Sequence, residues 1–425
     1  MRFEHIGFGK PVSFADLPNG MRYYGRFDQV ANAGGIGIGV GSAYDPPGKR
    51  GIAHLVEHMM CRSCHKYSDE ETNLILRRYL GSSDGDINIR IDHHSTFYGH
   101  LMLLRPTHMR RCFDLLANLL KDRLTDQRGL EVERARILNE HRLRGIDDIS
   151  ELAWDTMLEM AYIRNPARNR IDCDPEELDR IKLPEVRAFI RKYYVPRNMF
   201  MIVLGPRFKV AERMANEHFR ELPDDPKPVS DYDFTDGYAP LKESIARVID
   251  RPGINQHHVM VGFRIEEFGR KNHYAFTVLD HILEQLLYYP LQEHGRGVYR
   301  NPVSVQRSKF HGVLGIHFAT MHGDLVSPNT ETVLSVCRQL REKLVDSGIF
   351  QAALNRSFYE WVGPFLNDAN KLEEMIIESA TNGDEDLDLL HSGRARLEKI
   401  SRKTIRKLAN QFLTPEHLMV HIKPA

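Results

Sequence analysis

Cysteine is scarce in this chain: five residues are scattered over 425 positions. Five scattered cysteines are too few for the disulfide framework of a secreted domain. We therefore expect a cytoplasmic location. Runs of about 18 apolar residues are absent, as is an apolar segment near the N-terminus, so no membrane span and no signal peptide are expected. Neither sign of charge is in excess, because Lys plus Arg and Asp plus Glu each number 58. Nucleic acid is not an expected partner, because binding it selects basic surface.

The length and a weak internal repeat predict two domains. A chain of 425 residues fits two cores of about 200 residues each. The sequence that starts at Ile181 matches the one that starts at Ile400, an offset of 400 − 181 = 219. Each copy reads as an amphipathic helix, a proline stop and an apolar strand. We predict a first domain over 1–221, a proline- and aspartate-rich linker over 222–243, and a second domain over 244–425.

Mixed strand and helix patterns predict an α+β fold. Each of two tandem homologous domains is expected to be a mostly antiparallel sheet packed with helices. Strand patterns cover 35–41, 86–98 and 199–204, and helical patterns cover 51–62, 69–80, 107–122, 127–144 and 184–194. The run GIGIGVG over 35–41 lacks the third glycine of a dinucleotide-binding loop. It predicts a strand with a glycine face against which another element packs closely.

The residues that point to chemistry are His54-x-x-Glu57-His58. Positions i, i+3 and i+4 share one helix face, so both imidazoles and the carboxylate converge. Zinc accepts two imidazoles and a carboxylate and keeps a position for water, and a nearby glutamate can take the proton of that water. His-x-x-Glu-His is the inverzincin order of this motif. Two zinc ligands, His54 and His58, and a catalytic base, Glu57, are therefore predicted.

Other interpretations of these histidines and cysteines stay open from the residues alone. An amphipathic helix can carry His54 and His58 as surface or buried structural residues. Cys61-x-x-Cys64-His65 has the spacing of a c-type haem attachment site, and a zinc knuckle would need a second cysteine pair. Cys61 alone could lie near the metal or simply fill space.

The sequence around the motif resembles the pitrilysin family of zinc metallopeptidases, the inverzincins. Residues 41–60, GSAYDPPGKRGIAHLVEHMM, are similar to the zinc-helix segment of that family. Further similar stretches, in the family's order, are Thr96–Tyr98, 162–206 and LQEHGRGVY at 291–299. The length suits the short two-domain type found in bacterial enzymes that resemble mitochondrial processing peptidase. The resemblance implies a zinc endopeptidase with one Zn²⁺ per chain.

The family resemblance also implies a third ligand on a later helix. In this family that ligand is a glutamate with a supporting glutamate seven residues earlier. Glu140 and Glu133 match them, because 140 − 133 = 7. Glu140 is thus expected to bind the metal and Glu133 to support the histidines. Glu131 and His141 are the alternatives.

The family's substrate contacts map onto three more residues. Family members bind the peptide as an extra strand at a sheet edge, which here is expected to follow Asn88. In the second half Tyr299 matches a substrate-gripping tyrosine, whereas Gln292 stands where an arginine is expected. Arg296 is nearby and is the expected substitute. His93 and His94 are expected to be solvated residues of the edge strand.

The second half has no His-x-x-Glu-His motif, so its expected role is to close over the substrate. An offset of 219 places His54 on His273, and neither Glu57 nor His58 has a counterpart there. The two domains amount to half of the family's four-domain clamshell, so a homodimer or a heterodimer with a sister subunit is expected. The alternatives are a processing peptidase dedicated to one precursor and a non-catalytic assembly subunit.

Overall fold

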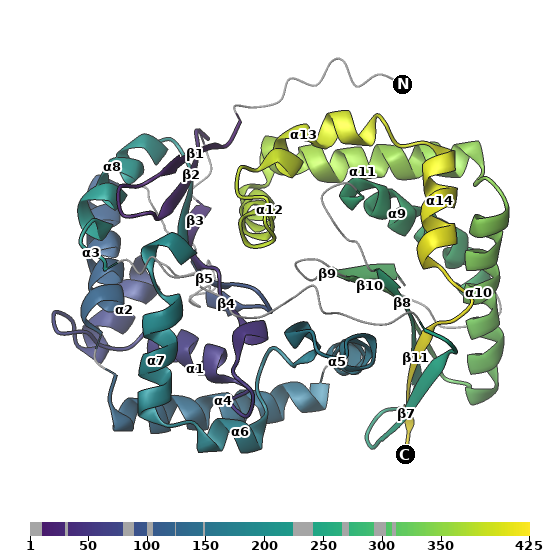
Figure 1. The fold of residues 1–425 in the computed structure, drawn as a ribbon, viewed down its shortest axis with the longest axis horizontal. Coiled ribbons are helices and arrows are strands. Elements are labelled where there is room, and N and C mark those ends of the chain that lie inside the picture. Colours follow the sequence, from purple (N-terminus) through teal and green to yellow (C-terminus); the bar gives the residue numbers. More distant parts are fainter. Residues whose placement is uncertain are drawn as a thin grey trace. The chain divides into compact units, whose positions relative to one another are not determined.

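The computed structural model describes residues 11–29, 33–79, 89–99, 105–123, 125–147, 149–223, 241–265, 272–292, 303–307 and 312–425. The chain forms two compact units, each built around its own sheet (Figure 1). Unit 1 comprises Met1–Arg142, Arg170–Tyr232 and Val362–His391, and unit 2 comprises Leu143–Asn169, Asp233–Trp361 and Ser392–Ala425. Both units draw on both halves of the sequence. The boundaries 1–221, 222–243 and 244–425 stay a prediction about the repeat.

The sheet of unit 1 has six strands in the order β1-β2-β6-β3-β5-β4. They are β1 Ser13–Asp16, β2 Arg22–Arg26, β3 Ala33–Ile38, β4 Ile89–Ile91, β5 Thr96–Gly99 and β6 Met199–Leu204. Only the β2–β6 pair is parallel. The predicted mostly antiparallel α+β fold is therefore confirmed for this unit.

The sheet of unit 2 repeats this plan with five strands in the order β7-β11-β8-β10-β9. They are β7 Ile245–Arg251, β8 His257–Ile265, β9 Val303–Arg307, β10 Gly312–Thr320 and β11 Leu418–Pro424. The β7–β11 pair is parallel and the other pairs are antiparallel, as for their counterparts in unit 1. The same strand order with the same directions confirms the two homologous sheets that the repeat predicts.

Equivalent helices and strands give the repeat offset element by element. Helices α7 (Leu183–Tyr193) and α14 (Arg402–Phe412) differ by 219 at both ends, and α4 (Gln127–Asp147) and α11 (Ser347–Asn367) differ by 220. In the sheets, Ile36 pairs with Met201 and Met260 pairs with Val420. The equivalent residues Met201 and Val420 differ by 420 − 201 = 219, whereas their partners Ile36 and Met260 differ by 260 − 36 = 224. The offset between the repeats is therefore larger for the strand that comes earlier in each half.

The repeats exchange one helix each. Helix α5 (Ile149–Ala161) follows α4 in sequence but packs on β8 and β11 of unit 2, where Met157 is fully buried (Figure 1). Helix α12 (Ala369–Thr381) follows α11 but packs on β3 and β6 of unit 1. The apolar face of each helix is therefore buried on the sheet of the other repeat, which is why the units are not continuous in sequence.

The remaining helices cover the two sheets. They are α1 Ile52–Met59, α2 Asp69–Tyr79, α3 Pro106–Asp122, α6 Pro175–Arg180, α8 Phe208–Phe219, α9 His273–Gln292, α10 Val326–Glu342 and α13 Asp388–Leu397. Short 3₁₀ turns lie at Ser42–Tyr44, Pro166–Arg168, Pro196–Asn198 and Gly323–Leu325. In the described part of the chain, no helix has the length and apolarity to cross a bilayer.

The single strand predicted over 86–98 is wrong in its described part, because a turn divides 89–99 into the hairpin β4–β5. Asp92 causes the turn: its side chain accepts hydrogen bonds from the amides of His94 and Ser95, both at 2.6 Å. His94 is consequently buried beside the ring of Tyr44 rather than solvated at an edge. β4 is one of the two edge strands of the sheet, and β1 is the other.

The glycine-rich strand packs as its sequence predicts. All six residues of β3 are buried. A Cβ built on Gly37 would stand 2.1 Å from the ring of Phe200 on β6, so a side chain here would require the ring to move. The absence of side chains on this face lets neighbouring strands and rings approach β3 closely.

Candidate metal centre

Helix α1 carries the predicted motif and is anchored at its N-terminus by a buried carboxylate. Asp45 accepts hydrogen bonds from the amide of Gly51 at 2.6 Å and of Ala53 at 3.0 Å. Gly51 has φ 99°, a left-handed conformation that disfavours residues with a side chain. Burial raises the pKa of Asp45 to about 7, against the lowering effect of these two backbone bonds. These contacts fix where the helix begins and which way its histidines point.

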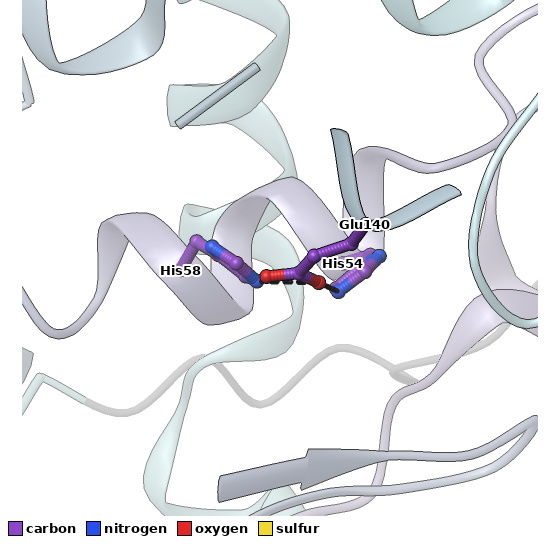
Figure 2. A group of neighbouring side chains, drawn as sticks. All are labelled: His54, His58 and Glu140. Atoms are coloured by element: carbon purple, nitrogen blue, oxygen red, sulfur yellow. Dashed lines mark ion pairs between the residues drawn. The ribbon is translucent and has the colours of Figure 1, made fainter. Parts of the chain in front are cut away.

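The structure brings His54, His58 and Glu140 together, two from α1 and one from α4 (Figure 2). One carboxylate oxygen of Glu140 lies 3.7 Å from Nε2 of His54 and 3.7 Å from Nε2 of His58. Two ligand atoms on one tetrahedral zinc ion stand roughly 3.3 to 3.6 Å apart. These separations are close to those of ligands that share one ion, and they are too long for direct hydrogen bonds.

His54 is held by the backbone of a distant loop. Its Nδ1 lies 3.0 Å from the carbonyl oxygen of Asp172. Because a carbonyl only accepts, Nδ1 carries the proton and the lone pair is on Nε2, which faces Glu140. His54 is only 3% exposed. The loop thus sets both the tautomer and the ring orientation that a metal ligand requires.

His58 is held by Glu133. Its Nδ1 lies 3.2 Å from a carboxylate oxygen of Glu133, which again leaves Nε2 with the lone pair that faces Glu140. Glu133 is 2% exposed and also pairs with Arg62 at 2.9 Å and Arg136 at 3.0 Å. Burial acts to raise the pKa of Glu133, but the His58 hydrogen bond and these two cations outweigh it and hold the pKa below its ordinary value. The carboxylate is therefore ionised beside His58.

Glu57 lies next to this cluster without belonging to it. Its carboxylate is 3.6 Å from Nε2 of His54, and the residue is only 6% exposed. It shares the helix face of the two histidines because it is one turn from His54. A carboxylate in this place can exchange a proton with a group held between the histidines and Glu140.

Sequence reasoning missed the residues that support the cluster from outside. Arg136 stands one turn after Glu133, a spacing that could have indicated the pair. Asp45, Arg62 and Asp172 carry no such signal, because their contacts depend on how the chain returns to α1. Asp172 is itself fixed by Nδ1 of His141 at 2.5 Å and by the amide of Cys173 at 2.6 Å.

The alternatives to these residues find other surroundings. Glu131 is exposed on α4 and bonds to Gln127, whereas His141 bonds to Asp172. Three groups of metal-type ligands occur in the described part of the chain, and neither Cys61 nor Cys64 belongs to one. Cys61 is half-buried, and burial raises the pKa of its thiol far above the ordinary value, so it stays protonated.

Three predicted substrate residues, Asn88, Arg296 and Tyr299, lie outside the described residues. Gln292 is the last residue of α9, and its side chain is likewise not described. The roles of these residues stay predictions.

Two domains of one known peptidase family match successive segments of this chain. The family described as Insulinase (Peptidase family M16) matches residues 28–174. The domain described as Peptidase M16 inactive domain matches residues 180–357. The chain belongs to peptidase family M16, the pitrilysin family.

Individual relatives carry peptidase names. Zinc protease PqqE of Helicobacter pylori is 23% identical over 57% of this chain and 54% of its own length. The β subunit of mitochondrial-processing peptidase from Neurospora crassa is 24% identical over 52% of this chain and 45% of its own length. The chain thus spans about half of these two relatives. A zinc protease of Mycobacterium leprae, ML0855, is 20% identical over 94% of this chain and 89% of its own length.

Solved structures share the fold at low identity. A protease from Helicobacter pylori has a TM-score of 0.83 at 16% identity and covers 97% of this chain and 100% of its own. The periplasmic protease PqqL from Escherichia coli has a TM-score of 0.76 at 14% identity, and the match covers 99% of this chain and 48% of that one. These similarities establish the fold of a two-domain M16-like protein.

Proposed function

We propose that this chain is a zinc-dependent endopeptidase. The observation that carries the proposal is the convergence of three ligand atoms: one oxygen of Glu140 lies 3.7 Å from Nε2 of His54 and 3.7 Å from Nε2 of His58. Membership of a peptidase family supports it.

The donor set of these residues suits zinc. Two neutral imidazoles and a carboxylate are the ligand set of a catalytic site with an open position. Both histidines have their second ring nitrogen engaged, by Asp172 and Glu133, as metal-binding histidines do. His54, His58 and Glu140 would hold the ion, and bound zinc would polarise the scissile carbonyl and make water acidic enough to attack it.

Glu57 performs the proton transfers in this proposal. Its carboxylate takes a proton from the attacking water, and the carboxylic acid so formed passes the proton to the departing amine. Glu133 keeps Nδ1–H of His58 in place throughout. Asp172 does the same for His54 with its backbone carbonyl.

The substrate would be a peptide or unfolded segment bound as an added strand. β4 is one edge of the unit 1 sheet and offers main-chain groups for such pairing. An apolar pocket in the same unit lies beside this strand and could receive a substrate side chain. Its lining residues are Ile36, Ile38, Met60, Cys61, Leu76, Ile89, Tyr98, Leu116, Leu119 and Leu120. Asn88, Arg296 and Tyr299 are proposed to position the peptide, with the second half closing over it in a chamber.

A dimer is proposed for the active assembly. The chain matches about half of the Escherichia coli protease PqqL, so two copies would supply the four domains of the longer protein. The mitochondrial-processing peptidase matches include subunits named beta and alpha, which supports a sister subunit as the alternative partner. The cytoplasmic location stays a prediction, because PqqL is named a periplasmic protease.

The test is cleavage of a peptide library by the purified chain, measured with zinc removed and then restored. Hydrolysis should require zinc. Glu57→Gln should keep zinc and lose at least about a hundredfold in rate, because a general base is lost but no ligand is. Zinc loss in Glu57→Gln as large as in His58→Ala would contradict the assigned role. Matched Glu131→Gln, on an exposed residue of α4, should behave like the wild type.

The library also separates the alternatives. Cleavage of many unrelated peptides supports a general endopeptidase, whereas cleavage of one sequence class indicates a processing peptidase. Zinc-loaded protein that stays inert until another subunit is added indicates a sister chain. Robust hydrolysis by a homodimer, as judged by mass in solution, excludes that need. Zinc-loaded protein inert under all these conditions would point to an assembly subunit.

A further inference from the structure

Unit 2 contains a partly buried cluster of charged residues at the place that corresponds to the metal centre of unit 1. Helix α9 follows β8 as α1 follows β3, and α11 matches α4 with an offset of 220 at both ends. Glu360 on α11 therefore corresponds to Glu140, because 360 − 140 = 220. Likewise Arg356 corresponds to Arg136.

Helix α9 carries a partial copy of the zinc motif that a constant offset conceals. His281-x-x-Glu284-Gln285 repeats His54-x-x-Glu57-His58 except at its last position. His281 lies 281 − 54 = 227 residues after His54, and the strands before the two helices differ by a similar 224 residues. His281 is therefore the counterpart of His54, and His273, which a constant offset of 219 indicates, is not.

The contacts of His281 are those of an oriented metal ligand. Its Nε2 lies 2.7 Å from a carboxylate oxygen of Glu360, so Nε2 carries the proton. Its Nδ1 is buried and has no hydrogen-bond partner among the described residues. One carboxylate oxygen of Glu284 is also buried and has no hydrogen-bond partner among these residues. The side chains of His281 and Glu284 are only 4% and 8% exposed. A histidine with one nitrogen on a carboxylate and the other unengaged is the arrangement found in metal sites.

The spacing inside the cluster leaves room for an ion. Nδ1 of His281 lies 3.7 Å from the nearest oxygen of Glu284, the separation also found between the ligand atoms of unit 1. Asp280 contributes a further oxygen, and the three ligand atoms lie within 4.8 Å of one another. A buried lone pair that faces a carboxylate oxygen at 3.7 Å repels it unless a proton or a cation lies between the two atoms.

The charges around the cluster fit a divalent ion. Asp280, Glu284 and Glu360 carry three negative charges, and Arg356, which contacts Glu284 at 2.5 Å and Glu360 at 3.1 Å, carries one positive charge. Burial acts to lower the pKa of His281, but Glu284 and Glu360 raise it to about 9, so a metal ion would bind Nδ1 in place of a proton. Imidazole with carboxylates selects zinc-like transition metals over Mg²⁺ or Ca²⁺, which prefer oxygen alone.

We propose that Asp280, His281 and Glu284 bind a second divalent transition-metal ion, oriented by Glu360 and Arg356. The site is structural rather than hydrolytic, because Gln285 replaces the second histidine. It ties the centre of α9, through Glu360, to α11 within unit 2. The expected number of zinc ions per chain therefore rises from the one that the sequence resemblance implies.

The experiment measures metal content and zinc affinity of the full chain, independently of peptidase activity. Metal-free protein is titrated with Zn²⁺ by calorimetry, and metal is counted after gel filtration. The wild type should bind about two equivalents, and His281→Ala about one. The double variant His54→Ala/His58→Ala should retain about one equivalent, and its Co²⁺ form should show the visible bands of nitrogen and oxygen ligation without thiolate charge transfer.

Controls separate loss of the site from loss of the fold. Glu284→Gln preserves the side-chain size and should lose the same equivalent as His281→Ala with an unchanged circular dichroism spectrum. His322→Ala, an exposed histidine of the same unit, should keep both equivalents. One equivalent in the wild type together with none in His54→Ala/His58→Ala would overturn the proposal, and the cluster would then be an ion-pair network around protonated His281.

Discussion

Replacing Glu133 by glutamine should weaken zinc binding without abolishing it. The carboxylate is 2% exposed and faces three positive or proton-donating groups, on His58, Arg62 and Arg136. The amide keeps the size of the side chain, but it removes the charge and turns an NH₂ group toward at least one donor. Such losses behind a metal ligand reduce affinity about ten- to a hundredfold, which is about 1.4 to 2.8 kcal/mol.

The assay for this prediction is competition for Zn²⁺ between metal-free protein and a coloured chelator. Glu140→Gln should lose most of the zinc, because it removes a ligand, and Glu131→Gln on the exposed face of α4 should match the wild type. An affinity of Glu133→Gln within about twofold of wild type would refute the supporting role, given the effect expected of such contacts. A larger loss in Glu133→Gln than in Glu140→Gln would show that the two roles are exchanged.

Other predictions concern the residues that support α1 from outside. Asp172→Asn should lower zinc affinity by roughly tenfold, because an amide holds His141, and thereby the loop that orients His54, less strongly than the carboxylate does. Unchanged chelator competition would contradict this prediction. The pKa of Asp45 is higher folded than unfolded, so folding takes up a proton and wild-type stability should fall as pH rises from about 4 to 7. Asp45→Asn lacks this titration, so its free energy of unfolding, measured by denaturation at several pH values, should rise relative to that of the wild type as pH rises. The opposite trend would mean that Asp45 is ionised in the folded state. Gly51→Ala should lower the melting temperature, because φ is 99° and the new Cβ would lie 2.6 Å from Cβ of Cys173; an unchanged melting temperature would refute the strain.

Long-range pairing explains where sequence reasoning about the fold was wrong. The apolar alternation over 86–98 reads as one strand, yet Asp92 bends the chain and buries His94. A pattern of alternating residues cannot show whether a strand continues or folds back, since both bury the same faces. The exchange of α5 and α12 was equally invisible, because the apolar face of a helix does not specify which sheet will cover it.

Residue spacing alone predicts the local part of the centre. His54, Glu57 and His58 share one helix face because of their spacing, and Glu133 and Glu140 lie two turns apart on another helix. The folded chain adds that these helices meet and that Asp172 and Glu133 orient the two imidazoles. It also brings His281 to Glu360 in unit 2. The physical reason is that helix geometry is set by neighbours in the chain, whereas these contacts join residues that folding brings together from far apart. Local periodicity therefore predicts ligands, and packing alone supplies the partners that hold them.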